Sequence, residues 1–405
     1  MKKWWGKAAG FLLVFSLLVT AWPQKAAALT NDTQLIEVEW ESPVAVIGVE
    51  QQEEQFILSA ETPSGRVANF YFSFPKDGGV RFHADEEGYF RPEALQTIQY
   101  SGEEYEDGEK AVVMEAGDTV VRLYIESSPW RFEVYNSEGE LTVSYSADRI
   151  GLGYDEENGL RKVKIASGLA ENEVMFGLGE RFSGFIQNGK TVEVWNTDSF
   201  TQLQKSYGDH NVGYKNIPLL HSSAGYSVFH NNTYYGIVDV GESDPQEYSF
   251  EFYGPILDLY IWTGEPAENI DRYLELTGNT VLVPKWALSY WAGQSSSVWL
   301  EEGSDVDTVR ETVFSRLDRY EEMGTPIRNI FAEGIAAKTE LLPVVEEMHE
   351  RGIHCFGWMD STWRTFDTVE AKNVGDFAQW DDNLDPIVMW RDSPRARWWA
   401  SDGAN

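Results

Sequence analysis

The sequence has 405 residues, of which 66 are acidic and 32 are basic, so its formal net charge is −34 at pH 7. This charge repels nucleic acids and anionic membrane surfaces, so we expect neither as a partner. Cys355 is the only cysteine, which excludes an internal disulfide and leaves a hydrophobic core as the source of stability.

The N-terminal 28 residues have the layout of a secretory signal peptide. Basic residues in the first seven positions precede an apolar run over residues 8–22, and three alanines at 26–28 offer a cleavage site. The apolar run is shorter than the roughly 20 residues that span a bilayer. We therefore expect cleavage near Ala28 and a mature protein that is secreted or at the cell surface, with no membrane contact after cleavage.

Residues 29–283 have the pattern of an antiparallel β-sandwich. Stretches such as WRFEVYNSEGELTVSYS and YSVFHNNTYYGIVDVGE alternate apolar and polar residues and break at glycine, asparagine, aspartate and serine. Residues 137–139 and 231–233 are predicted to be hairpin tips. So many short strands at this spacing predict one large sandwich domain.

The pattern changes after Pro284. The runs WALSYWAGQ, IRNIFAEG and IHCFGWMD resemble buried strands, and helical runs over 304–323 and 339–351 separate them. The first helix is predicted to begin with a capping box of Ser304 and Asp307. Strands that alternate with helices indicate parallel pairing, so residues 284–405 are predicted to form the first part of a (β/α)8 TIM barrel. A complete barrel takes roughly 250 residues, so this one is expected to be incomplete.

Carboxylates that follow the barrel strands are candidate substrate contacts, because the carboxyl ends of the strands carry the active site in such barrels. Glu333 is the next-to-last residue of the second strand-like run, and Asp360 ends the third. Glycoside cleavage uses paired carboxylates as acid and as nucleophile or base. A carboxylate at the start of a loop can equally cap the next helix, so both interpretations stay open for these residues.

No motif in the sequence indicates a metal or a nucleotide. HERGIH, residues 349–354, misses the zinc-binding spacing H-E-x-x-H by one residue, and Gly352 breaks the helix between the histidines. FGLGERF has Phe182 where a dinucleotide-binding loop has its third glycine, and turn residues follow it in place of a helix. We expect no metal and no cofactor.

The stretches FGLGERF, VWNTD, IPLLHSSAGYSVFHNN and LPVVEEMHERGIHCFGWMD follow one another in a characteristic order and spacing. In these stretches the chain resembles glycoside hydrolase family 31, which contains α-glucosidases and α-xylosidases. The resemblance implies a galactose-mutarotase-like sandwich followed by a barrel, and an α-linked oligosaccharide or glycoside as substrate. It places Asp198 on a loop over the barrel mouth. The candidate substrate-binding residues are Asp198, Trp291, Glu333 and Asp360, with Trp291 stacking on a sugar.

The resemblance also implies a retaining mechanism with two catalytic aspartates, which follow the fourth and sixth barrel strands in that family. No run after RARWW in this sequence matches them, so we assign no catalytic residue and expect the 405-residue chain itself to be inactive. The alternative is a sandwich that binds carbohydrate or a partner without chemistry. An intact aldose-epimerase-like sandwich is disfavoured because a barrel start follows without a break.

Overall fold

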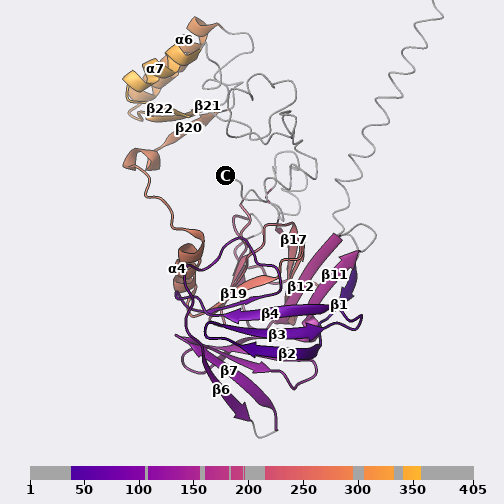
Figure 1. Ribbon diagram of the computed structural model, residues 1–405. Coiled ribbons are helices and arrows are strands. Elements are labelled where there is room, and N and C mark those ends of the chain that lie inside the picture. The colour runs from indigo at the N-terminus through magenta and orange to yellow at the C-terminus, as the bar shows by residue number, and fades with distance from the viewer. Residues whose placement is uncertain are drawn as a thin grey trace, which may run out of the picture. The chain divides into compact units, whose positions relative to one another are not determined.

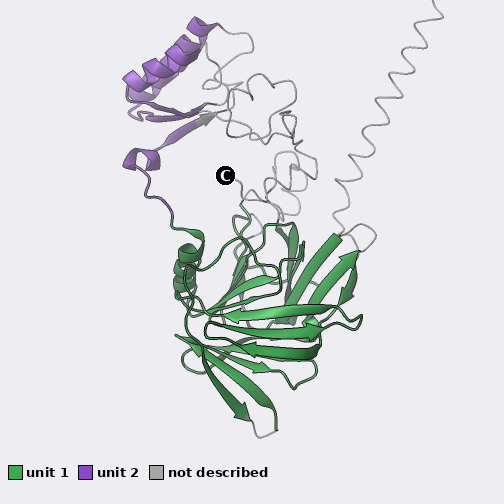
Figure 2. Cartoon of the chain, in the orientation of Figure 1, with its two compact units in different colours: residues 1–279, 392–405 green, residues 280–391 purple. Residues whose placement is uncertain are grey.

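The structure is a computed structural model that describes residues 38–104, 108–155, 160–181, 184–194, 196, 215–294, 305–332 and 341–356. The chain divides into two compact units, the first reaching Asn279 and the second beginning at Thr280 (Figure 2). The predicted domain boundary at residue 284 lies inside the second unit. The predicted signal peptide lies outside the described residues. None of the described helices has both the length and the apolar character needed to cross a bilayer.

The described residues of the first unit form three antiparallel sheets (Figure 1). The eight-stranded sheet has the order β13-β15-β16-β19-β5-β4-β3-β2, the six-stranded sheet β1-β11-β12-β18-β17-β14, and the five-stranded sheet β10-β9-β8-β7-β6. The strands are β1 (Glu39–Glu41), β2 (Ala45–Gln51), β3 (Gln55–Glu61), β4 (Val67–Ser73), β5 (Val80–His83), β6 (Gln99–Glu104), β7 (Lys110–Ala116), β8 (Thr119–Tyr124), β9 (Arg131–Tyr135), β10 (Leu141–Ser146), β11 (Ile150–Asp155), β12 (Leu160–Gly168), β13 (Met175–Gly177), β14 (Lys190–Val194), β15 (Leu219–Ser222), β16 (Tyr226–His230), β17 (Gly236–Val240), β18 (Glu247–Tyr253) and β19 (Asp258–Thr263). A short 3-10 helix, η1 (Ala147–Arg149), precedes β11, and helix α4 (Pro266–Thr277) follows β19. The predicted antiparallel fold is confirmed.

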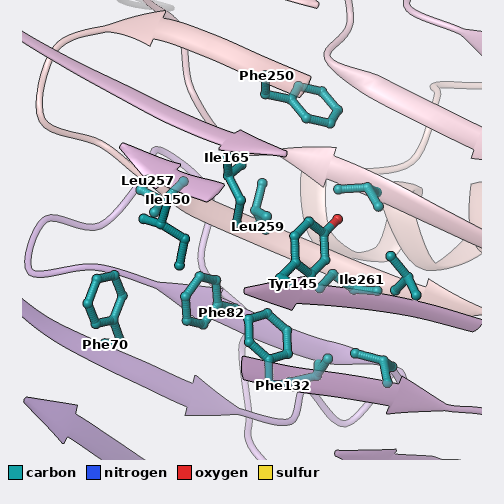
Figure 3. Close-up of a cluster of buried hydrophobic side chains, with 14 of the residues drawn as sticks. Phe70, Phe82, Phe132, Tyr145, Ile150, Ile165, Phe250, Leu257, Leu259 and Ile261 are labelled. Atoms are coloured by element: carbon teal, nitrogen blue, oxygen red, sulfur yellow. The ribbon is translucent and has the colours of Figure 1, made fainter. Parts of the chain in front are cut away.

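One continuous hydrophobic core joins the three sheets. It forms because alternate residues of each strand point inward, as the sequence pattern predicts. Phe82 of the eight-stranded sheet packs 4.7 Å from Phe132 of the five-stranded sheet, measured between ring centroids. Ile165 and Phe250 add side chains from the six-stranded sheet (Figure 3). All four side chains are almost completely buried, so the rigid part of this unit lies at the junction of its sheets.

The two predicted hairpin tips have different outcomes. Residues 137–139 connect β9 and β10, which pair with each other, so this hairpin is confirmed. The prediction for residues 231–233 is wrong, because β16 belongs to the eight-stranded sheet and β17 to the six-stranded sheet. The chain crosses between sheets there, and Asn231 and Asn232 are buried. Their amide groups bond to distant chain segments, so these asparagines hold a crossing in place of a turn.

The second unit contains a parallel sheet with the order β20-β21-β22. Its elements are the 3-10 helix η2 (Lys285–Leu288), β20 (Trp291–Gln294), α6 (Val306–Glu322), β21 (Asn329–Ala332), α7 (Leu342–Glu350) and β22 (His354–Phe356). Helices α6 and α7 lie on one side of this sheet (Figure 1). Val313 of α6, Val344 of α7 and Ile330 of β21 are fully buried in the core between them.

Two local details differ from the predictions for this unit. Helix α6 is capped by Asp305, whose carboxylate accepts a hydrogen bond of 2.8 Å from the Thr308 amide, in place of the predicted Ser304. The strand predicted over 286–294 begins with η2, because the backbone turns after Pro284 and the Ser289 amide donates to the Trp286 carbonyl. The alternation of parallel strands and helices agrees with the sequence pattern.

Candidate functional site

Three of the four predicted substrate-binding residues, Asp198, Glu333 and Asp360, lie outside the described residues. The structure does describe chain that precedes two of them. Asn196 lies two positions before Asp198, and β21 ends at Ala332, directly before Glu333. The roles of the three carboxylates stay predictions, and the structure shows how the chain near them is held.

Arg181 anchors the chain on both sides of the segment that carries Asp198. Its Nη2 donates to the backbone carbonyl of Glu193 at 2.8 Å, and to the side-chain oxygen of Asn216 at 2.5 Å. Its Nε donates to the Leu178 carbonyl at 3.0 Å. Burial lowers the pKa of Arg181 to about 10, so the guanidinium stays charged at neutral pH. One side chain thus binds the end of β14, the turn after β13 and the segment that precedes β15.

Asn216 continues this network toward Asp198. Its backbone amide donates to the Asn196 side-chain oxygen at 2.7 Å, and its Nδ2 donates to the same oxygen at 3.0 Å. Residues 196 and 216 are therefore held side by side although 20 residues separate them in the sequence. The motifs FGLGERF and VWNTD contain Arg181 and Asn196, but no sequence signal indicated Asn216, which connects them.

The glycines of FGLGERF serve close backbone packing. Gly179 has φ of +87°, and a Cβ at this position would lie 2.1 Å from the Lys215 carbonyl oxygen. Between the glycines, Leu178 has a left-handed φ of 67°, and its amide donates to the Leu219 carbonyl at 2.9 Å. The turn thus lies directly against residues 215–219. A phosphate-binding loop needs backbone amides that are free to bind the ligand. The Leu178 amide is instead bonded to the Leu219 carbonyl, which agrees with the sequence argument against such a loop.

Replacing Gly179 with alanine is expected to lower the free energy of unfolding of the first unit by about 2–4 kcal/mol. The cost combines positive-φ strain with overpacking against the Lys215 carbonyl. Gly189→Ala is the matched control, because Gly189 also has a positive φ but open space around its Cβ position, so about 1–2 kcal/mol is expected. Urea unfolding of both variants measures the difference. Equal losses would show that residues 215–217 move aside at little cost.

Trp291 lies on an aromatic face of the parallel sheet. It is the first residue of β20, where it pairs with Asn329, so it lies at the amino end of the strand. Its ring lies 4.5 Å from Phe356, and its indole N–H donates to the Ala287 carbonyl at 2.8 Å. Trp286 stacks on His354 on this face, with ring centroids 3.8 Å apart. The half-buried indole is already held by protein contacts, and its predicted stacking on a sugar stays a prediction.

A serine–histidine pair in the first unit has a structural role. His221 Nδ1 and Ser227 Oγ lie 2.7 Å apart, and Asn269 Nδ2 donates to the same hydroxyl at 2.9 Å. A nucleophilic serine must reach its substrate, whereas Ser227 is fully buried. Burial also lowers the pKa of His221. The three side chains join α4 to the eight-stranded sheet.

Metal and thiol chemistry find little support among the described residues. No group of three or more His, Cys, Asp or Glu side chains there is arranged to hold a metal ion. Cys355 is a free thiol in β22, and burial raises its pKa, which disfavours the reactive thiolate.

The sheets and helices define the class of the protein: a galactose-mutarotase-like antiparallel sandwich, with a parallel strand–helix unit following it in the chain. Residues 69–239 match the glycosyl hydrolase 31 N-terminal galactose mutarotase-like domain. The chain therefore carries the N-terminal domain of glycosyl hydrolase family 31, and the family resemblance seen in the sequence is confirmed.

The chain is similar to several longer proteins over part of their length. The chain is 26% identical over 302 residues to alpha-xylosidase XylQ of Lactiplantibacillus pentosus, covering 68% of this chain and 37% of the relative. It is 31% identical over 160 residues to an alpha-xylosidase of Emericella nidulans, covering 39% and 19%. The structure of a cycloalternan-forming enzyme from Listeria monocytogenes, in complex with a pentasaccharide substrate, matches with a TM-score of 0.66 at 18% identity, covering 90% of this chain and 38% of that chain. The chain spans less than two fifths of each of these proteins.

Proposed function

We propose that this protein hydrolyses the O-glycosyl bonds of α-glucosides or α-xylosides with retention of configuration. The observation that carries the proposal is the match of residues 69–239 to the family 31 N-terminal domain, with a parallel strand–helix unit following in the same chain. Relatives named α-xylosidase support the substrate class. We further propose that the second unit is the start of a TIM barrel, and that the N-terminal pattern directs export.

In this proposal the two units have different tasks. The sandwich holds the segment that carries Asp198 through Arg181 and Asn216, and the barrel strands carry Glu333 and Asp360 near the substrate hydroxyls. A retaining mechanism needs a nucleophilic carboxylate and an acid–base carboxylate about 5–5.5 Å apart. We assign no residue of this chain to either role.

The alternative is a protein that binds carbohydrate and performs no chemistry. The observation in its favour is that the described residues offer two aromatic surfaces, the sheet face around Trp291 and the exposed ring of Phe185. Aromatic rings are common in carbohydrate-binding surfaces because they stack on the apolar faces of sugars. Binding without turnover by every form of the protein would favour this alternative.

The test is release of nitrophenol from aryl α-xylosides and aryl α-glucosides. The 405-residue chain is expected to show no turnover above background, and a version extended through a complete barrel is expected to hydrolyse at least one substrate. Losing both catalytic groups costs several orders of magnitude, so the contrast is large. An aryl β-xyloside is the control substrate and should remain intact. Turnover by the short chain at a rate near that of the long one would contradict the assignment and make Glu333 and Asp360 the first residues to mutate.

A further inference from the structure

We propose that the turn over residues 184–189 of the sandwich is a carbohydrate-binding platform, on which the exposed ring of Phe185 stacks against a pyranose ring of a neutral oligosaccharide. The class of ligand rests on the proposed function. The platform itself rests on the geometry of this turn, which lies among described residues of the first unit. None of the predicted substrate-binding residues, Asp198, Trp291, Glu333 and Asp360, belongs to it.

Phe185 is a large apolar side chain held in the open. It is 72% exposed, although its ring is stacked 4.8 Å from Phe176 of β13 with an interplanar angle of 21°. Phe176 in turn stacks on His221 of β15, with centroids 5.3 Å apart and an angle of 27°. Three rings from three chain segments thus form one column. The inner face of Phe185 is covered by Phe176, and its high exposure places the outer face in solvent.

The turn is fixed by hydrogen bonds, so the ring is presented rigidly. The Gln187 amide donates to the Met175 carbonyl at 2.9 Å, and the Gln187 side chain donates to the Gly184 carbonyl at 3.0 Å. The Met175 amide donates to the Asn188 side chain at 2.7 Å. Binding of a ligand to this ring therefore loses little conformational entropy in the loop, and a small contact surface can suffice for binding.

The size and charge of the surface select the ligand. Beside Phe185, only Ile186 of this turn is a large exposed apolar residue, at 49%. A stable protein partner needs roughly 800 Å² on each side, which two side chains do not supply. The net charge of −34 opposes a second copy of this chain and anionic ligands. A neutral sugar ring has an apolar face of about the area of one phenyl ring, and its hydroxyls can reach the exposed backbone of the turn.

The experiment measures binding of isomaltotriose and of an α-xylose-bearing xyloglucan oligosaccharide to the 405-residue chain by calorimetry. Phe185→Ala is expected to weaken binding of at least one probe about tenfold or more, because it removes the stacking area. Phe185→Trp keeps an aromatic face and is expected to retain binding. Tyr89→Ala is the matched control, since Tyr89 is also exposed, at 55%, and contacts a neighbouring ring, Phe90.

Three results would overturn the platform. The first is unchanged affinity in Phe185→Ala, and the second is absence of binding of both probes by the parent chain. The third is an equal loss of binding in Tyr89→Ala, which would show that the effect is not specific to the ring of Phe185. Hydrolysis is assayed separately, on the version extended through a complete barrel. Failure of that version to hydrolyse any aryl α-glycoside contradicts only the enzymatic proposal, and binding that does not depend on Phe185 contradicts only the platform.

Discussion

Asp258→Ala is expected to lower the free energy of unfolding of the first unit by about 3–5 kcal/mol, because it leaves a buried guanidinium without its counter-charge. Asp258 is fully buried at the start of β19. Arg81 of β5 binds it through two parallel hydrogen bonds of 2.9 and 2.8 Å. Burial alone would lower the pKa of Arg81, but the hydrogen bonds and charge of Asp258 more than offset this and raise it.

Two further donors make Asp258 the centre of a network. The Gly88 amide donates to Oδ2 at 2.7 Å, and Asn231 Nδ2 donates to the same oxygen at 2.9 Å. Asn231 also donates to the Phe90 carbonyl, so the network joins β5, β19, the crossing after β16 and the loop near Gly88. Removing the carboxylate leaves several buried donors without an acceptor at once, and each unpaired donor costs free energy.

Glu86→Ala is the control, because Glu86 also pairs with an arginine. The Arg161–Glu86 pair is 3.4 Å long, and its side chains are 54% and 55% exposed. Exposed pairs contribute about 0–1 kcal/mol, so the change should be small. Urea unfolding followed by tryptophan fluorescence compares both variants with the parent. A loss below about 1 kcal/mol for Asp258→Ala would mean that water enters and solvates Arg81.

His230 is expected to make the first unit less stable as the pH falls from about 6.5 to about 4. Its ring is fully buried, 4.4 Å from Phe252, and makes no hydrogen bond of ordinary geometry to the described residues. Burial lowers its pKa from 6.5 to about 4. Above 6.5 the imidazole is neutral in both states and the effect is absent. Below 6.5 only the unfolded chain takes up the proton, so stability falls by about 1.4 kcal/mol per pH unit, to a total of about 3 kcal/mol.

His230→Leu removes this titration and fits the apolar surroundings. Near neutral pH its free energy of unfolding should be close to that of the parent or higher. At pH 4.5 it should exceed the parent by about 2–3 kcal/mol. Burial also lowers the pKa values of His83 and His221, so these residues also make the parent less stable as the pH falls. The difference in free energy of unfolding between parent and variant isolates the contribution of His230. His349→Leu, at an exposed helix position, is the control. Parallel pH profiles for parent and His230→Leu would show that the buried ring gains a proton partner in the folded state.

The sequence specified much of the local structure. Alternation in β9 and β10 predicted a hairpin with its tip at residues 137–139, and the strands pair there. The helical run over 304–323 is confirmed as α6, where Val309, Val313 and Leu317 recur at helical spacing and are buried. Such patterns are readable because strand and helix periods determine which side chains share a face.

Pairing between distant segments was decided by the tertiary structure. Arg81 and Asp258 are 177 residues apart, and nothing in their local sequence distinguishes them from solvated surface charges. The crossing at Asn231 resembles a hairpin tip in sequence because asparagine favours both turns and buried amide bonds. Nothing in the sequence around Asn216 indicated its hydrogen bonds with Arg181 and Asn196, which depend on the fold. Periodicity determines the inward face of a strand, whereas the choice of its neighbour depends on how all strands together close one core. For this protein, the sequence determined the elements and the family, and only the closed sandwich determined which polar groups meet.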